Sequence, residues 1–127
     1  MPDRIVIAPI TLKWSAWTWW DVVAMDTRAH PGARVPNKRP GVYEVREHGQ
    51  DERLTIGKAG DLRHRVKQGL VRGKAPHPAG VSIRTNEDVN RVEIRWALTE
   101  RPAAVEEELH RRHRLRHGRL PRYTCHT

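Results

Sequence analysis

The sequence contains no phenylalanine, and its only cysteine is Cys125. A lone cysteine excludes an internal disulfide and argues against a cysteine-based zinc site. Long apolar runs are also missing, since the longest, residues 5–12, is interrupted by Pro9. That run is far shorter than the roughly 20 residues needed to span a bilayer, and no signal-peptide cleavage site follows it. We therefore expect a cytoplasmic protein with no membrane partner.

Acidic residues are few relative to basic ones. The chain of 127 residues has 24 Lys and Arg against 15 Asp and Glu, which gives a net charge of +9. Such an excess favours an anionic partner, most often nucleic acid, although a solvated basic surface would give the same count. The length suits one main core. We expect a Trp-rich extension, residues 1–39, packed on a core domain, residues 40–127.

Aromatic residues are concentrated near the N-terminus, where four of the five tryptophans lie between Trp14 and Trp20. A strand over residues 5–12 and a helix from Ser15 to about residue 27 are predicted, with Ser15 as the N-cap. The tryptophans of such a helix would normally be buried. Alternatively, they form a docking surface for a protein partner or a second copy, or a stacking platform for bases.

The middle of the chain predicts two strands and a helix. Residues 41–47 and 53–58 are separated by a short polar bend, which is typical of an antiparallel hairpin. A helix capped by Asp61 should follow, because apolar residues recur every four positions, and Gly69 or Gly73 should end it. Residues 73–90 contain several prolines and glycines and are interpreted largely as a loop.

The last third predicts a strand and a helix. Residues 91–98 alternate between apolar and charged side chains, as a half-buried strand does. Pro102 suits the first turn of a helix that ends at Gly118. The resulting order implies an α+β fold, with a small antiparallel three-stranded sheet flanked by helices and an N-terminal strand and helix extension.

Tyr43 is the first candidate catalytic residue. A tyrosine in a strand is usually a packing residue. To act as a base it must lose a proton whose reference pKa is about 10, which requires nearby cations. Lys58 and Arg65 are the candidates in this sequence. Arg65 could equally cover the core with its aliphatic stem.

The final helix carries both acidic and basic candidates. At about 100° per residue, Glu106 flanks the apolar stripe defined by Val105 and Leu109, where a carboxylate can hold a divalent cation. The same side of the helix carries three histidines that could bind zinc or nickel: His110, His113 and His117. The surrounding arginines instead favour contact with a nucleic-acid backbone.

These residues together resemble the GIY-YIG nuclease family. Gly41-Val42-Tyr43 is similar to the first motif and Thr55-Ile56-Gly57 to the second, and TIGKAGDLRHRV resembles the segment that carries the family's arginine, here Arg65. In AAVEEELHRRH the family pattern, a glutamate three residues before a leucine, selects Glu106. The resemblance covers residues 40 to 124.

The resemblance implies a metal-dependent endonuclease that hydrolyses DNA phosphodiester bonds. Glu106 would hold a single Mg²⁺ or Mn²⁺, Tyr43 would accept a proton from the attacking water, and Arg65 would stabilise the phosphate. Lys58 would assist electrostatically. Six further cations are candidate contacts to the nucleic-acid backbone: Arg63, Lys67, Arg72, Lys74, Arg84 and Arg112.

Two departures from the family pattern leave alternatives open. Thr55 replaces the tyrosine of the second motif, and Thr124 replaces the usual C-terminal asparagine. Thr55 keeps a hydroxyl with shorter reach, and Lys58 or Tyr123 could take over part of the tyrosine's role. The alternatives are a weak or inactive nucleic-acid-binding module of the same fold and a basic protein-interaction domain built around the tryptophans.

Overall fold

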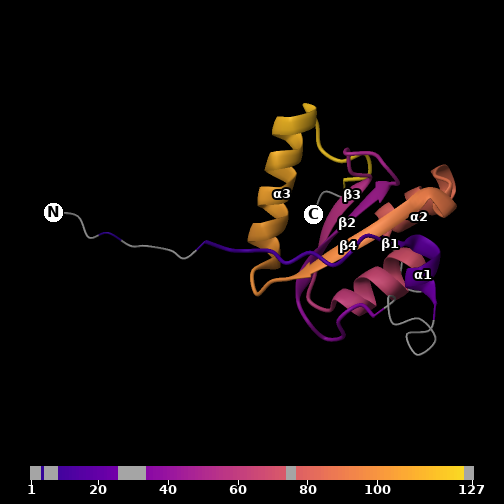
Figure 1. Cartoon of the computed structure of the whole chain (residues 1–127), viewed down its shortest axis with the longest axis horizontal. Helices are drawn as coiled ribbons and strands as arrows, with labels where there is room; N and C mark the ends of the chain where they lie inside the picture. The colour runs from indigo at the N-terminus through magenta and orange to yellow at the C-terminus, as the bar shows by residue number, and fades with distance from the viewer. Residues whose placement is uncertain (1–3, 5–8, 26–33, 74–76, 125–127) are drawn as a thin grey trace.

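The computed structural model describes residues 4, 9–25, 34–73 and 77–124. It is a small α+β domain in which α3 covers one face of an antiparallel sheet and the remaining helices cover the other (Figure 1). The elements are, in order, β1 (Thr18–Trp19), α1 (Trp20–Ala24), β2 (Gly41–Glu47), β3 (Thr55–Ala59), η2 (Arg63–Val71), α2 (Pro78–Asn86), η3 (Val89–Arg91), β4 (Val92–Leu98) and α3 (Pro102–His117).

The sheet has four strands in the order β1-β4-β2-β3, which corrects the expected three. The predicted hairpin is present as β2 and β3, and the predicted last strand is β4. Strand β2 lies in the centre, where Tyr43 pairs with Gly57 of β3 and with Trp96 of β4. The two expected motifs therefore lie side by side on paired strands. Strand β3 is at the edge of the sheet.

The N-terminal region differs from the prediction. Residues 9–12 form no strand, and residues 5–8, 26 and 27 of the predicted elements lie outside the described residues. Ser15 does not cap a helix. Its backbone amide donates to the Trp96 carbonyl, and its hydroxyl accepts from the Trp96 amide. The segment around Ser15 therefore runs beside β4, to which it is hydrogen-bonded, and α1 begins only at Trp20.

Side chains alternate between two faces of the sheet. On the η2 face, Tyr43, Val45 and Ile94 join a large core that also holds Trp20 and Val23 from the N-terminal region. On the α3 face, a smaller apolar cluster is formed by Val42, Ala97 and Val105.

The rest of the α3 face is charged and carries two of the tryptophans. The guanidinium of Arg95 lies 4.2 Å from the Trp14 ring centre and 4.6 Å from that of Trp17. Arg46 also stacks on Trp17, at 4.0 Å. Of the four tryptophans between positions 14 and 20, only Trp20 is buried in the core. Trp19 is 43% exposed, and Trp14 and Trp17 are half-buried.

Helix η2 forms where the sequence predicts a helix. The Asp61 carboxylate accepts from the amides of Lys38 and His64, and the three apolar residues of the predicted stripe, Leu62, Val66 and Leu70, are fully buried. The helix is wider than an α-helix: the Arg72 amide donates to the carbonyl of Lys67, five residues earlier. Gly73 follows it with φ of 69°, a conformation that glycine adopts readily.

Helix α2 replaces much of the predicted loop. The ring of His77 caps it by accepting from the Gly80 amide, and Pro78 occupies its first turn. A Cβ built on Gly80 would lie 2.7 Å from the Leu70 carbonyl oxygen, so glycine allows α2 to pack closely on η2. Helix α3 runs as predicted to Gly118, whose φ is 75°.

None of the helices within the described ranges has the length and apolar character needed to cross a bilayer.

Candidate functional site

The candidate site begins at the contact between Tyr43 and Gly57. The two residues pair across β2 and β3, and the phenol lies over the glycine. A Cβ at position 57 would lie 2.3 Å from the Tyr43 hydroxyl oxygen. Only a residue without a side chain leaves room for this phenol, which crosses toward the edge strand and is 2% exposed.

His77 completes this part of the site, although no motif or spacing in the sequence points to it. Its Nε2 lies 2.9 Å from the Tyr43 hydroxyl, in a buried contact between residues 34 positions apart. Its Nδ1 accepts from the Gly80 amide at 3.2 Å. Burial, and then the charges of Arg65 and Arg84, lower the pKa of His77. Burial and these charges thus disfavour the protonated form of the ring beside the phenol.

Arg65 is exposed on η2, and its charge acts on His77. Tyr43 and Arg65 both act on this histidine, Tyr43 by a hydrogen bond and Arg65 by its charge. No ion pair of the Arg65 guanidinium is present within the described part of the chain. Its charge is thus available to an anionic ligand.

Lys58 and Glu106 lie together in a second part of the site. They line a cavity of about 630 Å³ between β3 and α3, with His110, Arg111 and Arg114. Helix α3 is held against the edge strand at this cavity, because the His110 Nε2–H donates to the Ile56 carbonyl at 3.1 Å. Glu106 lies one turn before His110 and makes no ion pair with any described residue.

The two parts meet at β3 from opposite faces of the sheet. Gly57 underlies Tyr43 on the η2 face, and its neighbour Lys58 projects on the α3 face toward Glu106. Among the described residues, neither Tyr43 nor Arg65 lines the Lys58–Glu106 cavity. The structure therefore does not bring Tyr43 and Glu106 into one cavity: Tyr43 lies with His77 on the η2 face, and Glu106 lies with Lys58 on the α3 face.

Thr55 and Tyr123 have structural contacts. The Thr55 hydroxyl donates to the Tyr123 carbonyl at 3.0 Å, and the Tyr123 amide donates to the Leu54 carbonyl at 2.8 Å. The Tyr123 hydroxyl donates to Glu87 at 2.6 Å, and burial and this bond raise the pKa of Tyr123. Both hydroxyl groups hold the C-terminal segment, which disfavours the idea that either replaces the motif tyrosine.

Several of the cations predicted to contact the nucleic-acid backbone instead donate hydrogen bonds to carbonyl groups of the protein. Arg63 donates to the Val35 carbonyl, Arg72 to the Ala24 carbonyl and Arg84 to the Leu70 carbonyl. The latter two satisfy carbonyl groups at helix ends, a common role for arginine.

The remaining predicted contacts differ in accessibility. Lys67 is only 4% exposed and donates to the Met25 carbonyl, so it is not a surface cation as expected. Arg112 is exposed but pairs with Glu108 at 3.0 Å. Side-chain hydrogen bonds from Arg111 and Arg112 lower the pKa of Glu108 to about 2. Lys74 lies outside the described residues.

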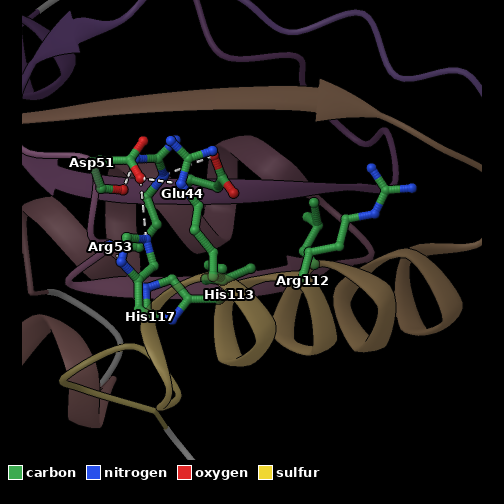
Figure 2. A pocket seen from close by; sticks show the side chains of 9 residues that line it. Glu44, Asp51, Arg53, Arg112, His113 and His117 are labelled. Atoms are coloured by element: carbon green, nitrogen blue, oxygen red, sulfur yellow. Dashed lines mark hydrogen bonds and ion pairs between the residues drawn. The ribbon is translucent and has the colours of Figure 1, made fainter.

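A smaller cavity of about 170 Å³ lies between the β2–β3 hairpin and the C-terminal half of α3. Figure 2 shows Glu44, Arg53 and His113 within it, with Arg112 directed away from them. Glu44 is 5% exposed and accepts from Arg53 and Arg95. This network ties the hairpin to the sheet.

The three histidines of α3 do not form the metal site considered from the sequence. His113 accepts from the Arg53 amide and donates to the Arg119 carbonyl, while His117 lies 3.2 Å from the Asp51 carboxylate. His110 donates to β3. Across the part of the chain that the structure describes, no three His, Cys, Asp or Glu residues are grouped to hold a metal.

Neither the protein-family models, nor the curated proteins, nor the solved structures include a match to this chain.

Proposed function

We propose that this protein is a metal-dependent endonuclease of the GIY-YIG type that hydrolyses DNA phosphodiester bonds. The observation that carries the proposal is the pairing of Tyr43 with Gly57, because it sets the first motif tyrosine directly on the glycine of the second motif. Lys58 and Glu106 line one cavity beside β3, and the charge of Arg65 acts on His77, which contacts Tyr43. These are the residue types that phosphodiester hydrolysis requires.

The carboxylate of Glu106 fits a weakly held divalent cation. Mg²⁺ keeps several waters and is commonly bound by one or two carboxylates together with substrate phosphate. Glu106 has no ion-pair partner among the described residues, whereas Glu108 is held by two arginines. When bound, Mg²⁺ or Mn²⁺ would polarise a phosphate oxygen as a Lewis acid.

The protein's own side chains have separate roles. In the proposed reaction Tyr43, in its phenolate form, has the role of accepting a proton from the attacking water. Because Tyr43 is 2% exposed and does not line the Glu106 cavity, this role requires the phenol to become accessible to that water. The exposed guanidinium of Arg65 binds the phosphate as negative charge develops on it. Lys58 adds positive charge beside Glu106 and attracts the phosphate backbone to the cavity.

The test is cleavage of plasmid DNA in the presence of Mn²⁺ or Mg²⁺. Glu106→Ala and Arg65→Ala should each reduce cleavage by roughly 100-fold or more, with DNA retardation retained. Glu100→Ala removes an exposed carboxylate outside the cavity and is the matched control. No cleavage by the wild type with either metal would contradict the proposal.

A second candidate function is a nucleic-acid-binding module that does not cut. It is favoured by the burial of Tyr43 and by the use of the Thr55 hydroxyl to hold the C-terminal segment. Retardation of DNA that weakens steeply with salt, without cleavage by any variant, would establish this alternative. Absence of salt-sensitive binding would instead favour a partner protein.

A further inference from the structure

The direction of the hydrogen bond between His77 and Tyr43 can be derived from the neighbouring contact. A neutral imidazole carries hydrogen on one nitrogen only. The Gly80 amide can only donate, and it points at Nδ1 of His77 from 3.2 Å. Nδ1 must therefore carry the lone pair, and the hydrogen must be on Nε2. Since Nε2 lies 2.9 Å from the phenol oxygen, His77 donates and the Tyr43 oxygen accepts.

The fold keeps this tautomer in place. His77 is the N-cap of α2, so its ring cannot turn without losing the bond that satisfies the Gly80 amide. A doubly protonated ring would bring an N–H against that amide. His77 is 7% exposed, which also disfavours the charged form.

The surrounding charges act in the same direction. Within the described residues, Arg65 from η2 and Arg84 from α2 are the cations that act on His77, and both oppose its protonation. The neighbour of Tyr43 on β3, Gly57, is uncharged. A positive potential that disfavours an imidazolium also favours a phenolate at the same place, and it opposes the effect of burial, which disfavours the phenolate of Tyr43.

We propose that His77 is a positioning residue that donates a hydrogen bond to the Tyr43 oxygen, with its tautomer fixed by the Gly80 amide, and thereby favours the phenolate of Tyr43. His77 is thus not the base that removes the Tyr43 proton. The catalytic meaning of this arrangement rests on the proposed nuclease function, whereas the tautomer and the ionisation of Tyr43 do not.

The tautomer can be measured directly by ¹⁵N NMR of the imidazole nitrogens, with His77 assigned by the signals lost in His77→Asn. Above the pH at which histidine titrates, we expect Nδ1 to give the signal of an unprotonated nitrogen and Nε2 that of a protonated one. A protonated Nδ1 would overturn the proposal, because His77 would then accept from Tyr43.

The ionisation of Tyr43 can be isolated because the chain has only 2 tyrosines. In a Tyr123→Phe background, ¹³Cζ-labelled tyrosine reports Tyr43 alone. Two variants separate the roles of His77. The Asn side chain of His77→Asn can still accept from the Gly80 amide but is too short to reach the phenol. His77→Gln keeps a donor near the position of Nε2.

We expect His77→Asn to raise the midpoint of the Tyr43 titration by roughly one pH unit or more, and His77→Gln to restore most of it. An unchanged or lower midpoint in folded His77→Asn would overturn the proposal. If the protein cleaves DNA, the acid limb of its pH–rate profile should move to higher pH in the same variant. Failure of cleavage would refute the nuclease function and leave the NMR result intact.

Discussion

The phenol of Tyr43 lies against the backbone of Gly57, with no space for a methyl group between them. This contact joins the two sequence motifs into one feature. It also makes the position of the phenol depend on a residue that has no side chain of its own.

Gly57→Ala should therefore displace Tyr43. The new methyl group would require the phenol to move or β3 to shift, and we expect a loss of about 1–3 kcal/mol in the free energy of unfolding. Gly60→Ala is the matched control, because a Cβ there would meet nothing within 4 Å. Denaturant unfolding would measure both, and equal stability of the two variants would contradict the tight contact.

Thr55→Val tests whether the Thr55 hydroxyl is structural. The substitution keeps the shape and removes the bond to the Tyr123 carbonyl, so stability should fall by about 1 kcal/mol. Amide exchange at Tyr123 should accelerate as the C-terminal segment loosens. Lost DNA cleavage at unchanged stability would show instead that the hydroxyl takes part in the reaction.

The charged network under Trp17 should be important for stability. The Glu44 side chain is 6% exposed and pairs with Arg53 and Arg95, whose side chains are 13% and 22% exposed. Glu44→Ala leaves both guanidinium groups without their carboxylate, and we expect a loss of about 3 kcal/mol. By comparison, Glu108→Ala breaks ion pairs on the surface and should leave the Tm unchanged. A similar Tm for the two variants would count against a buried network.

His113 should make the fold sensitive to mild acid. Burial has the largest influence on the pKa of His113 and lowers it, despite the opposing effect of the Arg119 carbonyl. The unfolded chain therefore binds a proton below about pH 6.5, where the folded chain does not. The stability that the neutral ring provides is present above that pH and is lost as the pH falls through the folded pKa.

Urea unfolding between about pH 8 and about pH 5 would measure this effect, since most carboxylates titrate lower. His113→Gln should make the loss of stability with falling pH less steep than in the wild type. His77 contributes in the same direction, because its pKa is also lowered. Parallel pH profiles for wild type and His113→Gln would show that His113 does not titrate during unfolding.

Local signals in the sequence predicted most of the fold. The polar bend predicted the hairpin of β2 and β3, and alternation predicted β4. The four-residue repeat and Asp61 predicted η2, and Pro102 with Gly118 bounded α3. Helix α2 was missed because the density of proline and glycine around it is typical of loops. Strand β1 was missed because pairing with β4 overrides the helical spacing of the tryptophans.

The site was less predictable for a physical reason. Tyr43, Arg65 and Glu106 were selected from motif order, and the structure separates Tyr43, beside His77 on the η2 face, from Glu106, in the cavity on the α3 face. His77 could not be selected, because its contact with Tyr43 depends on how α2 packs against η2. No periodicity or spacing in the sequence encodes that contact.

The edge position of β3 has a consequence for self-association. An unpaired outer strand can template the addition of a strand from another molecule. Here the His110 imidazole donates a hydrogen bond to the Ile56 carbonyl. The C-terminal segment is hydrogen-bonded to the Thr55 hydroxyl and the Leu54 carbonyl through Tyr123. An incoming strand would have to displace both contacts, so they disfavour edge-to-edge association of β3 with a strand of another molecule.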